Sequence, residues 1–190
     1  DPLFPLDWLT SPSLFALERR ALLTPLWTPL THVSRLPSPA SYITFPSVAG
    51  DFPIFLIRGK DNIIRAFHNV CRHRAYSVIR KESGFSLVLG CRYHGWCYDT
   101  RGKLIKAPYF EGVDGFWKED HSLFEVMCVN DKAGQVWVCL DPYADTDGPE
   151  LSVFEQWTEN KGLARDVEWL VGWEAEGNFN WKIGGKSDGN

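Results

Sequence analysis

Short apolar segments, each bounded by turn residues, occupy the middle of the chain. From residue 41 onward they are rich in Ile, Phe and Val, and Gly-Lys-Asp-Asn at 59–62 separates two of them. Such short segments are typical of strands, and frequent turns between them favour antiparallel pairing. The pattern therefore predicts a mainly β, antiparallel domain. Its strands are expected at residues 26–36, 42–45, 53–58, 63–68, 85–89, 96–99, 104–106, 124–130 and 135–140.

A helical pattern precedes these strands. Ser11 followed by Pro12 is a favourable helix start, because serine caps the first turn and proline fits its first position. Apolar residues then recur at helical spacing as far as Leu23. Residues 1–10 are apolar with two prolines and are expected to form an extended arm.

Mixed structure is expected after the last strand. Residues 141–150 are polar with two prolines and are interpreted as a linker. A helix is expected over 151–163 and a strand over 168–174. The sequence Asn-Trp-Lys at 180–182 follows, and residues 184–190 are expected to be a flexible tail.

Candidate chemistry is concentrated in residues 67–98. Cys71 and His73 are one residue apart, Cys91 and His94 are two residues apart, and seventeen residues separate the two pairs. Structural zinc sites usually place two cysteines before two histidines, whereas here each pair holds one of each. A zinc-stabilised module and four unligated core residues are the alternatives to an iron–sulfur centre.

These pairs and their neighbours resemble a known family. The stretches FHNVCRHR, CRYHGWCYD and APYFEGVDGFWKEDHSLFEV are similar to the alpha subunits of Rieske non-haem iron oxygenases. The resemblance runs from about Leu14 to Lys182. It implies a [2Fe-2S] cluster with Cys71 and Cys91 on the inner iron and His73 and His94 on the outer iron. Imidazole ligands raise the reduction potential from about −400 mV to about −150 to +300 mV.

Five positions near the cysteine–histidine pairs refine the resemblance. Rieske proteins of cytochrome bc complexes carry a disulfide at the positions of Tyr76 and Tyr93, so this chain cannot form it. Ala75 stands where the oxygenase family usually has glycine, which puts the backbone dihedral of that loop in question. Trp96 is expected to shield the cluster, and Tyr93 and Tyr98 are candidates for hydrogen bonds that tune it.

The resemblance also implies a domain order. Residues 1–35 are expected to form the N-terminal arm and helix, and residues 36–145 the Rieske domain. Residues 146–183 would hold a linker, a helix and the truncated start of an α+β catalytic domain. The mononuclear iron of the family needs two histidines and a carboxylate. The last histidine here is His121, so that Fe(II) is expected only in a full-length parent, and no catalytic residue is assigned.

The function implied is electron transfer within an oxygenase. Electrons would come from a ferredoxin or an NAD(P)H-dependent reductase and pass to a mononuclear iron that hydroxylates an organic substrate with O2. The catalytic domain and a neighbouring subunit are the other implied partners. Whether this chain is by itself an enzyme stays open. A stand-alone Rieske-type ferredoxin and a zinc-stabilised structural β module are the alternative functions.

Composition argues against other classes of protein and indicates a cellular location. A formal net charge of −4 argues against a nucleic-acid-binding protein, which usually has a basic face. The absence of a long apolar run argues against a membrane span. The remaining cysteines, Cys97, Cys128 and Cys139, are interpreted as free thiols in a reducing compartment. The cytoplasm is the expected location, or an organelle if a targeting segment has been removed.

Local positive charge surrounds the cysteine–histidine pairs. Docking of an acidic electron donor is the functional interpretation, and loop solvation with salt bridges is the alternative, which is favoured for Arg80 and Lys81. Ordinary structural roles are expected for His32, His68 and His121. The cations concerned are Arg72, Arg74, Arg80, Lys81 and Arg92.

Overall fold

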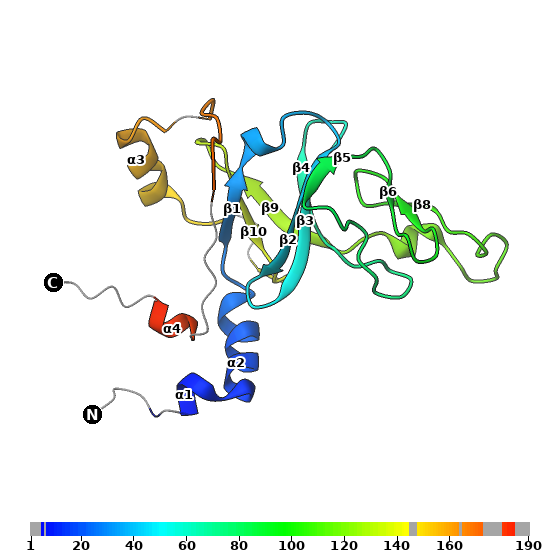
Figure 1. Cartoon of the computed structure of the whole chain (residues 1–190), viewed down its shortest axis with the longest axis horizontal. Helices are drawn as coiled ribbons and strands as arrows, with labels where there is room; N and C mark the ends of the chain where they lie inside the picture. The colour runs from blue at the N-terminus through cyan, green and yellow to red at the C-terminus, as the bar shows by residue number, and fades with distance from the viewer. Residues whose placement is uncertain (1–4, 6, 145–147, 164, 173–179, 185–190) are drawn as a thin grey trace.

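Two antiparallel sheets form the body of the computed structural model, which describes residues 5, 7–144, 148–163, 165–172 and 180–184. The large sheet has seven strands in the order β1-β10-β9-β4-β3-β2-β5, and the small one has three in the order β6-β7-β8. Figure 1 shows the small sheet and helix α3 at opposite ends of the large sheet. The large sheet comprises β1 (Thr28–His32), β2 (Ser41–Val48), β3 (Phe52–Arg58), β4 (Ile64–His68), β5 (Ser83–Phe85), β9 (Glu125–Asn130) and β10 (Gln135–Cys139). The small sheet comprises β6 (Leu89–Gly90), β7 (Cys97–Tyr98) and β8 (Leu104–Lys106).

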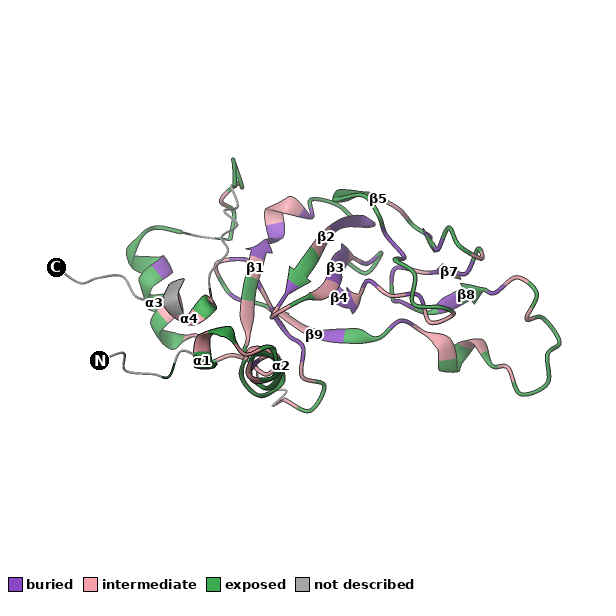
Figure 2. Cartoon of the chain, turned by 60° about the horizontal axis from the view of Figure 1, so that its bottom comes forward, coloured by how far each residue is buried: buried purple, intermediate pink, exposed green. Residues whose placement is uncertain are grey.

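Strand β3 explains how the sheet supports the candidate site. Its residues Ile54–Ile57 are fully buried and alternate between the two faces of the sheet. Phe55 and Ile57 pack in one core cluster with Cys71 and Cys91. Ile54 and Leu56 point to the other face and pack in a second cluster with residues of β10. Both faces are therefore covered, which is why this strand is a continuous apolar run rather than an alternating one. Figure 2 shows the buried residues along the strands.

The helices lie outside the sheets. They are α1 (Asp7–Thr10), α2 (Pro12–Glu18) with a π-helical extension η1 (Arg19–Leu23), α3 (Ser152–Asn160) and α4 (Trp181–Gly184), together with 3-10 turns η2 (Val33–Arg35) and η3 (Lys118–His121). Ser11 caps α2 as expected, since its Oγ accepts a hydrogen bond from the Leu14 amide at 3.3 Å. The helix expected over 151–163 is confirmed as α3. None of the described helices is long and apolar enough to cross a membrane.

Four expectations differ from the structure. Residues 7–10 of the expected extended arm are helical, and the first strand ends at His32, where its ring caps η2. The strand expected over 85–89 is wrong, because Phe85 pairs with Ser41 in the large sheet and Leu89 with Tyr98 in the small sheet. The chain crosses between the sheets there.

The fourth difference concerns the strand expected over 168–174. Residues 168–172 form no strand, and 173 and 174 lie outside the described residues. Leu170 and Val171 are 87% and 81% exposed, so their apolar side chains have no neighbouring strand to pack against. The amide of Trp169 holds this segment to η2, since it donates a hydrogen bond to Ser34 Oγ at 3.1 Å.

Helix α4 contacts the N-terminal helices. Lys182 Nζ donates to the buried Glu18 carboxylate and to the Trp8 carbonyl, and Trp181 Nε1 donates to Glu18 at 3.2 Å. The hydrogen bond from Lys182 lowers the pKa of Glu18, against the opposing effect of burial. Asn180 Nδ2 donates to the carbonyl of Leu9 at the end of α1. The Asn-Trp-Lys segment thus joins the two ends of the described chain (Figure 1).

Candidate metal centre

Two loops with the same backbone hydrogen bonds carry the cysteine–histidine pairs. In loop 71–76 the cysteine amide donates to the carbonyl five residues later at 2.8 Å, and the amide four residues later donates back to the cysteine carbonyl at 2.9 Å. Loop 91–96 repeats both bonds at 2.8 and 3.0 Å. The two cysteines therefore begin equivalent turns, and each turn carries one histidine at its tip.

The turn geometry shows what the alanine at position 75 does to a loop in which the oxygenase family usually has glycine. Ala75 adopts φ of +54° and its counterpart Gly95 adopts φ of +71°. Both lie in the left-handed region, which costs a residue with a side chain about 1 to 2 kcal/mol. Ala75 therefore keeps the backbone conformation that glycine would adopt more easily, and this loop carries local strain.

The two cysteines meet inside the core. Cys71 and Cys91 are 2% and 4% exposed, and neither forms a disulfide. Burial raises the pKa of the Cys91 thiol, and the adjacent Cys71 raises it further, against hydrogen bonds from the amides of Tyr93 and His94. Two neighbouring buried thiolates are unfavourable without a cation, whereas a bound metal would stabilise both.

The two histidines also come together. The rings of His73 and His94 have centroids 4.6 Å apart. His73 Nδ1 is buried and has no hydrogen-bond partner among the described residues. Burial lowers the pKa of His73, with contributions from His94 and Arg74, which favours the neutral ring that metal binding requires. A buried ring nitrogen without a partner is costly, so a metal bond at Nδ1 would satisfy it.

The donor set fits a two-iron cluster. In the described part of the chain, no three His, Cys, Asp or Glu side chains gather where they could hold one metal ion. A cluster of the Rieske type takes two cysteines on one iron and two histidines on the other. Two buried thiols beside two imidazoles match that division.

Comparison with a protein-family model identifies the domain that carries these ligand loops. The model of the Rieske [2Fe-2S] domain matches residues 26–117. This chain carries a Rieske [2Fe-2S] domain. The match includes both ligand loops and most strands of the two sheets, and it ends before the Asn-Trp-Lys segment.

The chain is similar to oxygenase subunits of known proteins. The carnitine monooxygenase oxygenase subunit of Acinetobacter baumannii is 31% identical over 181 residues, which are 95% of this chain and 48% of the relative. The benzene 1,2-dioxygenase alpha subunit of Pseudomonas putida is 37% identical over 53% of this chain and 22% of its own. The chain is homologous to these Rieske oxygenase subunits and spans about half the length of the carnitine relative.

Solved structures give the same relationship. The apo form of a quaternary ammonium Rieske monooxygenase matches with a TM-score of 0.84 and 32% identity, over 95% of this chain and 52% of that one. A naphthalene 1,2-dioxygenase matches with a TM-score of 0.69 and 31% identity, over 77% and 33%. The expected mainly β, antiparallel Rieske fold is confirmed.

Aromatic side chains enclose the histidine side of the Rieske domain. Trp96 is 2% exposed, and its ring stacks on His73 with centroids 4.9 Å apart and planes 8° from parallel. Phe110 packs edge-on against both rings, and Phe116 and His121 cover Trp96. The expected shielding role of Trp96 therefore agrees with its position. The sequence predicts an ordinary structural role for His121, and the structure places it among the aromatic side chains that cover Trp96.

Tyr98 contacts a candidate ligand directly. Its hydroxyl lies 3.3 Å from Cys71 Sγ and accepts a hydrogen bond from the Arg72 amide at 3.1 Å. Because the oxygen accepts from the amide, its proton is free to point at the sulfur. Burial raises the pKa of Tyr98, so the hydroxyl keeps that proton. Tyr93, the other candidate, packs against His94 with ring centroids 3.8 Å apart and planes tilted by 36°, and its hydroxyl makes no hydrogen bond with any described residue.

Replacing Tyr98 by phenylalanine is expected to lower the reduction potential of the bound cluster. A hydrogen bond to a thiolate stabilises the more negative, reduced state. A net contribution of about 0.5 to 1.5 kcal/mol corresponds to about 20 to 60 mV for one electron. Protein-film voltammetry measures the shift. Tyr93→Phe is the matched control and should leave the potential within about 10 mV. Equal potentials in the Tyr98 variant and the native chain would remove this role.

Asn69 is a residue that the sequence analysis missed. Its side chain is buried and forms two hydrogen bonds to Ile79, donating to the carbonyl at 2.8 Å and accepting from the amide at 2.9 Å. It therefore closes the base of the segment that carries Cys71 and His73. The available signal was an asparagine at the end of a strand, directly before the ligand loop.

The other singled-out side chains separate into two groups. Arg72 is structural, because it donates to the Ser122 carbonyl at 2.8 Å and lies over the Phe124 ring at 4.0 Å. His32 lies away from the site, with hydrogen bonds to Ser34 and the Ala133 carbonyl. His68 packs against Phe52. Among the singled-out cations, four have side chains that make no ion pair or hydrogen bond with any described residue: Arg74, Arg80, Lys81 and Arg92.

Proposed function

We propose that this chain is the electron-accepting part of a Rieske oxygenase subunit. The observation that carries the proposal is the convergence of two buried thiols and two imidazoles, one of them with an unpartnered buried nitrogen, on two equivalent loops. In this proposal Cys71 and Cys91 hold the inner iron, and His73 and His94 hold the outer iron. The bound [2Fe-2S] cluster supplies one-electron transfer.

The surrounding residues have separate tasks. Tyr98 donates its proton to Cys71 Sγ and so stabilises negative charge on that ligand. Trp96 and its aromatic neighbours exclude water from the histidine side. Asn69 fixes the loop that begins at Cys71. Together these residues hold the four ligands in place, so little rearrangement is needed when the charge of the site changes.

The wider activity belongs to the parent subunit. We infer electron donation by a ferredoxin or an NAD(P)H-dependent reductase, and delivery to a mononuclear iron held by the catalytic domain or a neighbouring subunit. Hydroxylation of an organic substrate with O2 would take place at that iron. The five described cysteines are free thiols, which supports the cytoplasm as the location.

One observation favours an oxygenase subunit over a stand-alone ferredoxin. Helix α4 and the N-terminal helices lie outside the part matched to the Rieske domain, yet they are joined by the hydrogen bonds of Lys182, Trp181 and Asn180. An electron carrier that consisted of the β domain alone would have no need for this contact. The expected boundaries 1–35, 36–145 and 146–183 stay predictions.

Metal and sulfide analysis with electron paramagnetic resonance tests the proposal. Protein purified without air should contain two irons and two acid-labile sulfides per chain. Reduction with dithionite should produce a signal whose averaged g value lies below that of the free electron. Zinc in place of iron would contradict the proposal and favour the structural β module.

A further inference from the structure

A groove opens beside the two ligand loops. It has a volume of about 450 Å³, and Tyr42, Val78, Ile79 and Leu89 line it. These four residues belong to the same buried cluster as Cys71 and Cys91. The groove also touches the residues on either side of Cys91, namely Gly90 and Arg92. A molecule seated in the groove would therefore be separated from the cysteine side of the site by packed protein that contains no bulk water.

Three cations line the same groove. Arg80, Lys81 and Arg92 are exposed, and none of their side chains makes an ion pair or hydrogen bond with any described residue. Some cations outside the groove are paired, such as Arg65 with Asp61 at 2.9 Å and Lys132 with Glu155 at 2.9 Å. Glu82 is the acidic residue adjacent in sequence, and it does not line the groove. Salt bridges, favoured for Arg80 and Lys81 from sequence, are therefore absent among the described residues.

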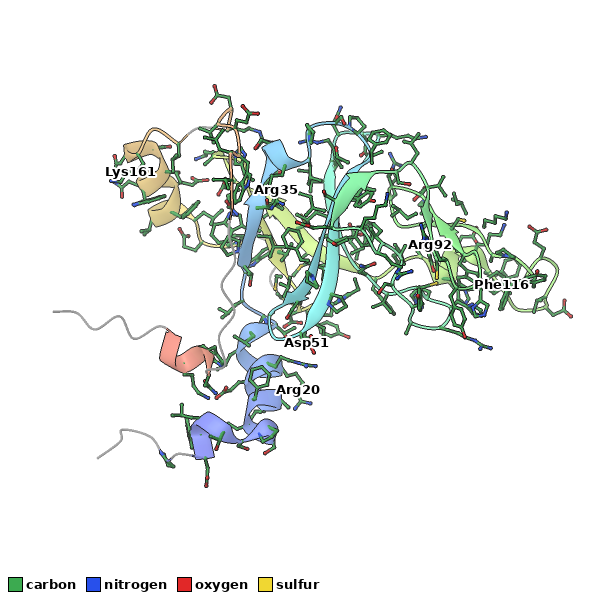
Figure 3. All side chains as sticks on the ribbon, viewed as in Figure 1. Arg20, Arg35, Asp51, Arg92, Phe116 and Lys161 are labelled. Carbon is green, nitrogen blue, oxygen red and sulfur yellow. The ribbon has the colours of Figure 1, made fainter. Side chains whose placement is uncertain are left out.

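Apolar side chains lie between these cations. Phe85 and Val88 line the groove and are 63% and 46% exposed. Phe85 ends β5, which is the last strand of the large sheet. Exposed aromatic and aliphatic side chains rimmed by charged ones are typical of protein–protein interaction sites. Figure 3 shows Arg92 at the end of the molecule that holds the small sheet.

We propose that this groove is the docking surface for an acidic one-electron donor protein of the [2Fe-2S] ferredoxin type. The proposal rests on the proposed function. The charge of Arg80, Lys81 and Arg92 selects a partner with a carboxylate-rich surface, and attraction between the two raises the rate of encounter. Phe85 and Val88 then pack against the apolar centre of that surface. The reduced donor loses one electron and the cluster of this chain gains it, with no bond made or broken.

Stopped-flow reduction of the cluster-loaded chain by a reduced plant-type [2Fe-2S] ferredoxin tests the proposal. Arg80→Glu combined with Lys81→Glu should lower the second-order rate constant about tenfold or more at low ionic strength. The difference from the native chain should shrink to less than about twofold at about 0.5 M salt, where the screening length is only a few ångströms. Phe85→Ser should slow the reaction at both salt concentrations.

A matched control separates docking from net charge. Lys60→Glu combined with Lys161→Glu makes the same change in net charge at two exposed positions outside the groove, and it should change the rate constant less than about twofold. Equal slowing by both double variants would overturn the docking surface. A change of oligomeric state in the Arg80/Lys81 variant, measured by sedimentation, would also overturn it, since the groove would then be an interface between copies.

Reduction by dithionite separates this proposal from the proposed function. Every variant should contain the native amount of iron and be fully reduced by dithionite. If dithionite reduces the cluster and the ferredoxin rate is insensitive to the groove, only the docking surface is wrong. If the native chain holds no reducible cluster, the proposed function itself is wrong.

Discussion

Cys71→Ser is expected to give a folded chain without a stable iron–sulfur cluster. Cys71 is buried beside Cys91 at the start of its loop, so no other described cysteine can replace it without moving the backbone. A serine hydroxyl is a harder ligand that does not ionise near neutral pH, whereas the inner iron of a Rieske cluster is held by two thiolates. Iron and sulfide content, visible absorbance and the reduced-state resonance signal should all fall to near zero.

The control for this substitution is another cysteine of the same chain. Cys128 lies in β9 and packs against the core cluster on the other face of the large sheet. Cys128→Ser should retain the native iron content, although burial raises the pKa of this thiol to about 12 and marks a largely apolar surrounding. A cluster retained in Cys71→Ser, or lost in Cys128→Ser, would contradict the assignment of the ligands.

Gly102→Ala is expected to destabilise the Rieske domain by about 3 kcal/mol. Gly102 adopts φ of +75° in the turn between β7 and β8, so any side chain there costs about 1 to 2 kcal/mol. An added Cβ would also overlap the ring of Phe67, with Cζ only 2.8 Å away. Phe67 is 1% exposed in the cluster that holds both cysteines, and overpacking a core costs about 1 to 3 kcal/mol more. Urea denaturation measures the loss.

Gly112→Ala isolates the contribution of the overlap. Gly112 has a similar φ of +80°, and an added Cβ there meets no atom within 4 Å. Its alanine variant should lose only about 1 to 2 kcal/mol, the cost of the left-handed backbone alone. Equal losses at Gly102 and Gly112 would mean that Phe67 moves aside without cost, and the tight packing beneath the ligand loops would be disproved.

Local chemistry made part of this protein predictable from sequence. Strands β2, β3, β4, β8, β9 and β10 follow from short apolar segments between turn residues, and the start of α2 follows from the Ser11 cap. The ligand candidates follow from residue type and spacing, because few side chains bind iron and their order along the chain distinguishes centres. The strand expected over 85–89 failed because its apolar residues serve two different sheets, which local pattern does not reveal.

The sequence alone determined which four side chains could bind a cluster, and that antiparallel strands would carry them. Only the tertiary structure decided that Tyr98 reaches the sulfur of Cys71, that Arg72 is held by Ser122, and that cations near the site remain unpaired around a groove. These contacts join residues far apart in sequence, and they depend on strand register and on the packing of one sheet against the loops. A one-residue shift in the register of β7 would send Tyr98 to the opposite face of the small sheet, away from Cys71.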